Sequence, residues 1–335
     1  MLKKKIFLTG GAGFIGSAVA KKLVDKGYEL TIFDNFSSGL KDNIKDISSK
    51  CNVVKGDILD YPSLKKSMQG HDIVIHQAAQ LEITTAISSP EKDVDTNIIG
   101  SLNILKAMKE NNIHKLIIAS SACVYGNVNK YPVTEDMTLK PNWEYGVSKL
   151  AVEKYCDIFA NYENIDIASL RYSIVYGVGE WYGRVLTIFI KRALENKDLV
   201  IFEDGGILRD FVNISDVADF NVMLVDREWK GHKIFNVSSG VATSLDEIAK
   251  IVQKITKKID NHNVKVIYES VSEGKFSKYV SGRMRIPREL KVMHLNNANA
   301  KKFLNWKPSL ELEKGIEQEY LWLKKDPKRW ITMSY

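Results

Sequence analysis

Cysteine is scarce in this chain of 335 residues, which has thiols only at positions 51, 123 and 156. Three cysteines at these spacings fit neither a disulfide framework nor a zinc site, and we expect no metal. So low a number is typical of proteins of the reducing cytoplasm, where we expect this one. Apolar runs are short as well, and none approaches the roughly 18 residues of a membrane-spanning helix, so we expect no membrane partner.

An excess of either charge is also missing. The chain has 48 Lys+Arg and 41 Asp+Glu, a net charge of +7, with basic and acidic residues interleaved. Proteins that bind nucleic acid usually gather basic residues in a stripe or a recognisable module, so we expect no nucleic-acid partner. The small positive excess would suit an anionic small molecule.

Short apolar segments alternate with helical patterns through the first half of the chain. The segments lack polar alternation, which is typical of strands buried on both faces of a parallel sheet. They lie at 6–8, 30–33, 52–54, 72–75, 115–118 and 166–170, with helical patterns notably at 14–26, 96–111 and 145–162. This alternation predicts an α/β fold, a Rossmann-type doubly wound parallel sheet with right-handed crossovers.

The alternation becomes irregular after about residue 177. We therefore predict a dinucleotide-binding domain at 1–177, to which 208–240 returns. A smaller mixed α/β lobe that binds the substrate is predicted at 178–207 and 241–335.

A glycine-rich turn, TGGAGFIG at 9–16, follows the first predicted strand and opens a predicted helix. In that context the glycines at 10, 13 and 16 permit a tight turn and close approach of the backbone to a pyrophosphate. The second predicted strand ends at Asp34, where an acid binds the adenosine ribose hydroxyls and would repel a 2′-phosphate. The pattern predicts NAD rather than NADP. Asp34 as a plain turn residue, and Asp57 as a cap for the following helix, are the structural alternatives.

Tyr145 and Lys149 are four residues apart at the start of a predicted helix and therefore share one of its faces. A free tyrosine, with a pKa of about 10, is a poor base at neutral pH, but a neighbouring ammonium group lowers that pKa. Tyr145 is thus a candidate general base for a substrate hydroxyl. Ser121 ends a predicted strand, at the edge of the sheet where ligands bind, and can hydrogen-bond the same hydroxyl.

At these motifs the chain resembles the extended short-chain dehydrogenase/reductase family, and within it the NAD-dependent nucleotide-sugar epimerases and dehydratases. The resemblance extends over nearly the whole chain. It is carried by 9–16, 76–79, 97–100, 120–126, 145–149, 170–172, 209–212, 236–240 and 306–308. It implies an enzyme that binds NAD and a nucleotide-diphosphate sugar, and a homodimer that pairs the helices at 96–111 and 145–162.

The resemblance also implies roles for single residues. Catalysis is implied for Ser121, Tyr145 and Lys149, with Cys123 as a further candidate. Cofactor contacts are implied for Gly10, Gly13, Phe14, Ile15, Gly16, Asp34, Asn35, Asp57, Ile58, Ala78, Ala79, Asn97, Tyr145 and Lys149. Substrate contacts are implied for Glu82, Arg209, Arg285 and Arg288. A structural ion pair is the alternative for Arg209, and a structural role is the alternative for His76 and Glu82.

Family members share a first step in which a tyrosine takes the C4 hydroxyl proton and NAD⁺ takes the hydride. Dehydratases and decarboxylases of the family usually add a carboxylate just after the strand-end serine or threonine, where this chain has Ala122 and Cys123. We therefore expect an isomerase that performs C4 epimerisation of a UDP-hexose through a transient 4-keto intermediate.

Three alternative functions remain open, and Cys123 has two possible roles. Epimerases that act at C3 and C5 of GDP-sugars carry a cysteine acid/base at the position of Cys123, paired with a lysine where this chain has Tyr182. A buried structural cysteine is the other interpretation of Cys123. A 4,6-dehydratase and a non-catalytic NAD sensor are less favoured, the second because the catalytic trio is intact. Ile174 replaces a phosphate-binding asparagine of the family.

Overall fold

The structure, a computed structural model, describes residues 3–180 and 183–326 and divides into two compact units. Unit 1 takes the residues up to Tyr172 together with Ser215–Val237 and Asn296–Lys307. Unit 2 takes Ser173–Ile214, Ser238–Leu295 and the residues from Pro308 onward. The sequence pattern predicts the first boundary at 177 and a returning segment at 208–240, without a third segment. The functional roles of the two units stay predictions.

Unit 1 is built on a seven-stranded parallel sheet in the order β10-β6-β5-β4-β1-β2-β3. Its strands are β1 (Lys5–Thr9), β2 (Glu29–Asp34), β3 (Asn52–Lys55), β4 (Ile73–His76), β5 (Lys115–Ser121), β6 (Asp166–Tyr172) and β10 (His232–Val237). The strand order reverses between β1 and β4, which creates the switch point where open α/β sheets bind their ligands. The predicted Rossmann-type sheet is confirmed.

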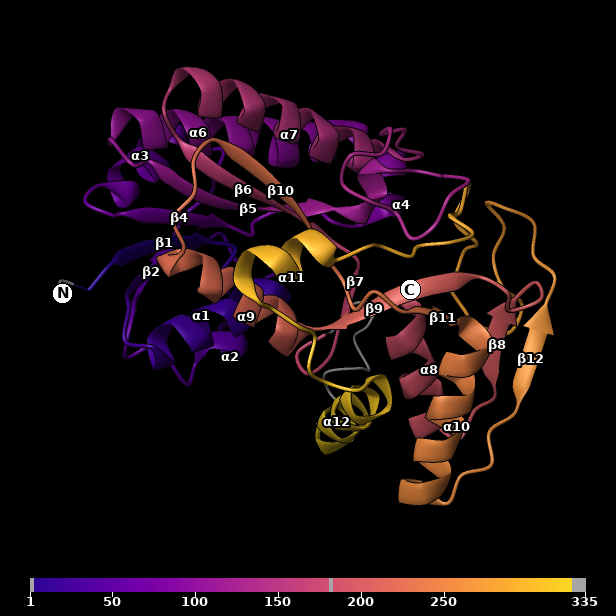
Figure 1. Cartoon of the computed structure of the whole chain (residues 1–335). Coiled ribbons are helices and arrows are strands. Elements are labelled where there is room, and N and C mark those ends of the chain that lie inside the picture. The colour runs from indigo at the N-terminus through magenta and orange to yellow at the C-terminus, as the bar shows by residue number, and fades with distance from the viewer. Residues whose placement is uncertain (1–2, 181–182, 327–335) are drawn as a thin grey trace. The chain divides into compact units, whose positions relative to one another are not determined.

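Helices cover both faces of this sheet. They are α1 (Phe14–Asp25), α2 (Lys41–Ile44), α3 (Tyr61–Met68), α4 (Ile83–Ser88), α5 (Pro90–Asp93), α6 (Gly100–Glu110), α7 (Glu144–Tyr162), α9 (Ile214–Asp226) and α11 (Ala298–Leu304). A π-helical turn, η1 (Val94–Ile99), joins α5 to α6, and a 3₁₀ turn, η2 (Ala122–Val124), follows β5. Figure 1 shows α3, α6 and α7 on one face and α1, α9 and α11 on the other. Apolar strand residues such as Phe7, Val74 and Leu116 are fully buried between these layers, each contributing roughly 1.5–3 kcal/mol.

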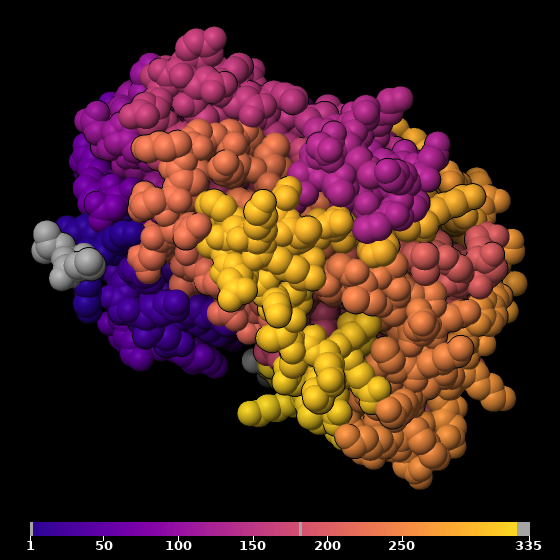
Figure 2. Space-filling view, in the orientation of Figure 1, coloured from indigo at the N-terminus to yellow at the C-terminus, as the bar shows by residue number. Residues whose placement is uncertain are grey.

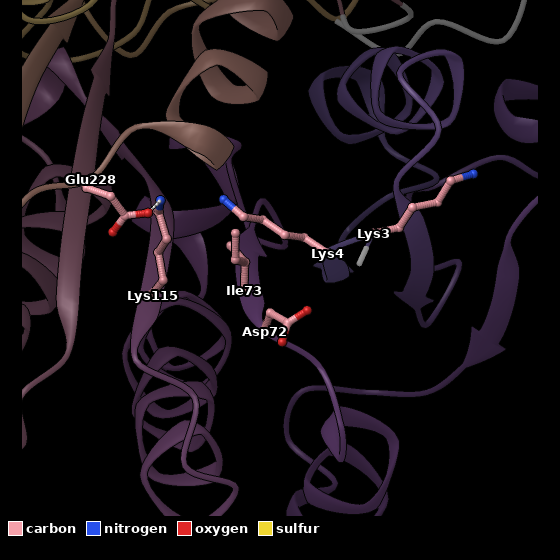
Figure 3. Close-up of a pocket in the computed structure, with 6 residues that line it drawn as sticks. All are labelled: Lys3, Lys4, Asp72, Ile73, Lys115 and Glu228. Carbon is pink, nitrogen blue, oxygen red and sulfur yellow. Dashed lines mark ion pairs between the residues drawn. The ribbon is translucent and has the colours of Figure 1, made fainter. Parts of the chain in front are cut away.

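A cavity of about 340 Å³ lies at the amino ends of β1, β4 and β5, and Figure 3 shows its lining residues. The ammonium groups of Lys4 and Lys115 both donate to the carbonyl of Val225, at 3.0 and 2.9 Å, and Lys115 also donates to that of Arg227. The two lysines thus satisfy carbonyls at the end of α9. Ligands of such sheets bind at the opposite, carboxyl ends of the strands, so we assign this cavity a structural role.

Unit 2 is a mixed α/β structure, as predicted. Its elements are β7 (Ile174–Tyr176), α8 (Val185–Leu194), β8 (Leu199–Phe202), β9 (Leu208–Asn213), β11 (Ala242–Ser244), α10 (Leu245–Asp260), β12 (Val266–Glu269) and α12 (Leu312–Lys325). The strands form a three-stranded sheet, β11-β9-β7, and a two-stranded sheet, β12-β8. Ser244 and Glu247 form a capping box that fixes the start of α10. Phe189, Ile248 and Tyr320 belong to the core between α8, α10 and α12.

Two carboxyl groups, Glu180 and Glu319, are buried in unit 2. Both oxygens of Glu319 and Oε1 of Glu180 lack a hydrogen bond of normal geometry within the described residues, and Arg184 lies 3.8 Å from Glu180. Burial is the main cause that raises the pKa of Glu180 to about 7. Burial, together with repulsion from Glu180, raises the pKa of Glu319 well above its usual range. The folded state therefore holds protons here that the unfolded chain releases near pH 4.5.

Replacing Glu319 with glutamine is expected to stabilise the protein at alkaline pH. Because the folded pKa values are raised, the stability that the protonated pair contributes is complete below about pH 4 and is lost as pH rises through about 7. Glutamine cannot ionise, so Glu319→Gln should gain about 1–3 kcal/mol at pH 8.5 and much less at pH 5. Thermal unfolding at both pH values measures this. The control is Glu317→Gln, the same change at a half-buried neighbour whose carboxylate is paired with Lys258. An equal effect of Glu319→Gln at the two pH values would contradict the prediction.

Candidate active site

The glycine turn between β1 and α1 packs closely against the loop that follows β4. Gly10 has φ of +66°, and a Cβ on it would lie 2.6 Å from the backbone nitrogen of Ala78. A Cβ on Gly16 would lie 2.0 Å from the carbonyl oxygen of Gly10. Gly13, the N-cap of α1, has no side chain that could accept from the first turn of the helix. The turn therefore offers the N–H groups of residues such as Phe14 and Ile15 to an anionic group, and the residues present fit a dinucleotide pyrophosphate.

Asp34 lies at the end of β2, buried, with its carboxylate against the glycine turn. Its two oxygens accept from the backbone N–H groups of Ala12 (2.9 Å) and Phe36 (2.8 Å). Burial raises the pKa of Asp34, and these two N–H groups oppose that shift. A carboxylate oxygen has a second acceptor site, so each can also accept from a ribose hydroxyl.

Asn35, Asp57 and Ile58 lie beyond the ends of β2 and β3. Asn35 donates to Asp57 at 2.9 Å, and Asp57 also accepts from the backbone nitrogen of Leu59. The N-cap of α3 is Asp60, so Asp57 does not cap that helix. The side chain of Ile58 is buried in the core of unit 1.

The loop after β4 holds Ala78 and Ala79, and Asn97 fixes the residue that follows them. The buried Asn97 side chain exchanges hydrogen bonds with the backbone of Gln80, at 2.9 and 3.0 Å. His76 is buried between Thr9 and Ser101, at 2.6 and 3.1 Å. Burial lowers the pKa of His76 to about 3, so the ring is neutral and its role is structural.

Lys149 and Tyr145 meet at the carboxyl end of β5. The Lys149 ammonium is buried, donates to the carbonyl of Ala119 at 3.0 Å, and lies 5.8 Å from the centroid of the Tyr145 ring. Burial lowers the pKa of Lys149 to about 8. Ser120 donates to Glu153 of α7 at 2.6 Å, whereas the hydroxyl of Ser121, the last residue of β5, turns toward η2 and accepts from its backbone.

Cys123 is buried in η2, directly beside Ser121, whose hydroxyl accepts from the backbone nitrogen of Cys123 at 3.2 Å. The structure thus brings the thiol-bearing residue next to the strand-end serine. Tyr182, which occupies the position of the second acid/base in the 3,5-epimerase alternative, lies outside the described residues.

A buried ion pair next to the trio was missed by the sequence analysis. Arg171, on β6, donates to both oxygens of Glu153, at 2.9 and 2.7 Å, and also to the hydroxyl of Tyr125. Both charged side chains are almost completely buried. A signal existed in the sequence, because Glu153 is four residues beyond Lys149 and so continues the polar row that begins at Tyr145.

The four predicted substrate residues lie in both units. In unit 1, Glu82 is exposed at the start of α4 and accepts from the Thr85 hydroxyl at 3.0 Å. In unit 2, Arg209 pairs with Glu289 at 3.1 Å, and Arg285 pairs with Glu203. The backbone nitrogen of Arg288, the residue before Glu289, donates to Glu273.

Two further features are absent from the described residues, 3–180 and 183–326. No cluster of three or more His, Cys, Asp or Glu side chains in these residues is placed to hold a metal ion. None of the helices they form is both long and apolar enough to cross a bilayer.

The chain is similar to known proteins of one family. Residues 6–238 match the model of the NAD dependent epimerase/dehydratase family. A putative UDP-glucose 4-epimerase of Methanocaldococcus jannaschii is 36% identical, over 95% of this chain and 98% of that protein. A UDP-N-acetyl-alpha-D-glucosaminuronate decarboxylase of Bacillus cytotoxicus is 30% identical, over 96% and 98%. The crystal structure of the Thermotoga maritima UDP-glucose 4-epimerase with UDP-glucose superimposes with a TM-score of 0.85 at 30% identity, covering 96% of this chain and 99% of that one. The chain therefore belongs to the NAD dependent epimerase/dehydratase family.

Proposed function

We propose that this protein is an NAD-dependent isomerase that inverts C4 of a UDP-hexose. One observation carries the proposal: the buried Lys149 ammonium lies beside Tyr145, at the carboxyl end of β5. Similarity to the UDP-glucose 4-epimerases supports the same reaction.

The glycine turn and Asp34 are proposed to hold NAD. The first-turn N–H groups of α1 would bind the pyrophosphate, and the carboxylate of Asp34 would accept from the adenosine ribose hydroxyls. A 2′-phosphate would meet the negative charge of Asp34, which is the reason for choosing NAD over NADP. This turn would hold NAD, which would supply the hydride acceptor and then the hydride donor for C4 of the sugar.

Tyr145 acts as the base that removes the proton of the C4 hydroxyl. The positive charge of Lys149 favours the phenolate form of Tyr145, because opposite charges attract strongly in a buried site. Ser121 donates a hydrogen bond to the C4 oxygen and holds it against the phenol. Tyr145 would return the proton to the C4 oxygen once C4 has been reduced from its other face, which leaves C4 inverted.

The residues after Ser121 separate this reaction from the others in the family. Decarboxylation or dehydration needs a further acid/base, and Ala122 and Cys123 provide no carboxylate there. Cys123 could exchange protons at C3 or C5, which is the second candidate function and is favoured by its place beside Ser121. We infer that three arginines of unit 2 bind the nucleotide diphosphate, because a guanidinium group can hydrogen-bond phosphate oxygens. They are Arg209, Arg285 and Arg288.

Product analysis by NMR tests the reaction. The enzyme is incubated in D₂O with UDP-glucose, UDP-N-acetylglucosamine or UDP-glucuronate, and the C4 epimer is followed by its proton couplings. Inversion at C4 without deuterium in the product supports the proposal, since the hydride does not exchange with water. Deuterium at C3 or C5 that disappears in Cys123→Ser would instead support the second candidate. If no UDP-hexose is inverted at C4, the proposal is wrong.

We also propose that the protein is a cytoplasmic homodimer that associates through α6 and α7. Val147, Ile158 and Tyr162 are 53%, 51% and 82% exposed on α7, spaced so that they lie along one stripe, and Ile99 is exposed beside α6. This part of unit 1 forms the upper rim of the view in Figure 2. An uncovered apolar stripe of this kind marks an association surface. Leu105 and Phe159, by contrast, pack into the core.

A charge placed in this stripe is expected to separate the dimer. Ile158→Glu puts a carboxylate among apolar side chains that association would bury, so the variant should be a monomer at micromolar concentration while the parent is a dimer. Light scattering during size-exclusion chromatography measures the mass of each. Val241→Glu, at an exposed apolar residue of unit 2, is the control and should remain a dimer. A monomeric parent, or a dimeric Ile158→Glu variant, would refute the assignment of this surface.

A further inference from the structure

Asp93, which the mechanism above does not use, is a fully buried carboxylate at the end of α5. One oxygen, Oδ1, accepts from Asn97 at 2.8 Å. The other, Oδ2, has no hydrogen-bond partner among the described residues. A buried carboxylate with only one hydrogen-bonded oxygen costs free energy, so we expect a positive charge nearby to compensate its negative charge.

The surroundings of Asp93 belong to the first turn of α7. Both α5 and η1 pack against α7. The Asn97 amide that donates to Asp93 also donates to the Ser148 hydroxyl at 3.4 Å, and Ser148 donates to the carbonyl of Tyr145 at 2.9 Å. The next residue along α7 is Lys149. Burial raises the pKa of Asp93 and lowers that of Lys149, and the attraction between the two charges opposes both shifts.

Two carboxylates, Asp93 and Glu153, attract the Lys149 ammonium, and only Glu153 is already neutralised by another cation. Glu153 is held by the Arg171 guanidinium through two hydrogen bonds, so its charge is largely balanced. Among the described residues, Lys149 is the only cation that acts on Asp93. The remaining titratable groups around Lys149 and Asp93 are the neutral His76, the thiol of Cys156, the Tyr145 phenol, and Glu144, which repels Asp93.

We propose that Asp93 is a positioning residue of the active site, the counter-charge that keeps the buried Lys149 ammonium protonated beside Tyr145. The inference rests on the function proposed for Lys149 and adds a residue to it. Burial disfavours the ammonium form, and a neutral Lys149 would no longer favour the Tyr145 phenolate. The buried carboxylate of Asp93 favours the protonated form of Lys149, and it does so without touching substrate or cofactor.

The direct test is the titration of Lys149 by NMR in enzyme labelled with ¹³C and ¹⁵N at lysine. The Lys149 signal is identified by its absence from Lys149→Met. We expect the pKa of Lys149, about 8 in the parent, to fall by roughly one unit or more in Asp93→Asn. The matched control is Asp95→Asn, the same change at an exposed residue two positions along, which should leave the signal where it is. An unchanged Lys149 pKa in Asp93→Asn overturns the inference.

Activity gives a second readout. In the pH profile of kcat, the alkaline limb should move to lower pH in Asp93→Asn by the same amount as the Lys149 titration, with the acid limb little changed. A loss of kcat that is equal at every pH would mean a merely structural role and would count against the inference. If the parent inverts no UDP-hexose, the proposed function fails, whereas the Lys149 titration still decides the role of Asp93.

The reciprocal measurement covers the case in which Asp93→Asn does not fold. In protein labelled at the aspartate carboxyl carbon, the pKa of Asp93 should be higher in Lys149→Met than in the parent, because the same attraction is then removed from the other side. An Asp93 titration that does not respond to Lys149→Met would overturn the inference.

Discussion

Tyr145→Phe is expected to lower the C4 epimerase turnover by about 10²–10⁴-fold while the protein keeps its NAD. Phenylalanine fills the space of the tyrosine ring but cannot take a proton from the substrate. The parts proposed to hold the cofactor, the glycine turn and Asp34, do not depend on the phenol oxygen. The measurement is the initial rate of UDP-glucose formation from UDP-galactose, alongside the amount of NAD released when the purified protein is denatured.

The control for this variant is Tyr155→Phe, the same change at an exposed tyrosine of the same helix. It should turn over at the parent rate. A Tyr145→Phe enzyme that retains more than a tenth of the parent rate would show that another group removes the proton, and the mechanism proposed for the trio would be wrong. Loss of both rate and bound NAD would instead point to damage of the cofactor site.

The residues that the sequence revealed are those whose spacing along the chain is itself the geometry. Tyr145 and Lys149 come together because they are one helical turn apart. The glycines at 10, 13 and 16 are recognisable because the turn that connects β1 to α1 is local, and Gly10 needs a positive φ there. Strands buried on both faces lack alternation, which is why the parallel sheet could be predicted from the apolar segments.

What the sequence concealed depends on contacts between distant segments. Arg171 pairs with Glu153 only when β6 packs beneath α7. The Asp93 carboxylate attracts Lys149 only when α5 packs against that same helix. The partner of Arg209 is Glu289, 80 residues away. The third segment of unit 1, Asn296–Lys307, is anchored by the indole N–H of Trp306, which donates to the carbonyl of Asp216. A local pattern can mark one member, as the polar row on α7 marks Glu153, but it does not identify the partner, because the partner alone is compatible with an ordinary surface or core position.

Glu153→Gln is expected to lower the free energy of unfolding by about 3–5 kcal/mol, more than any other single change considered for this chain. Glutamine keeps the shape of the side chain but removes the negative charge that balances Arg171. Because Arg171 is fully buried, its guanidinium would be left without a counter-charge in a low-dielectric environment. Arg171 also donates to the Tyr125 hydroxyl and to the carbonyl of Glu135, so it cannot leave the core without breaking further hydrogen bonds. Urea denaturation followed by circular dichroism measures the loss.

Two further variants separate the charge from simple packing. Glu163→Gln removes the same charge from the solvent-exposed pair with Lys109, and it should cost at most about 1 kcal/mol, since water already screens that pair. The double variant Glu153→Gln/Arg171→Met removes both charges of the pair, so no buried guanidinium is left without a counter-charge. It should be more stable than Glu153→Gln alone. Two outcomes would contradict the prediction: a loss of less than about 1 kcal/mol in the free energy of unfolding of Glu153→Gln, or a double variant that is less stable than Glu153→Gln. In either case the charges of the pair do not stabilise the packing of α7 on β6. The same row of polar residues on α7 would then serve catalysis at Lys149 without a matching structural role one turn further along the helix.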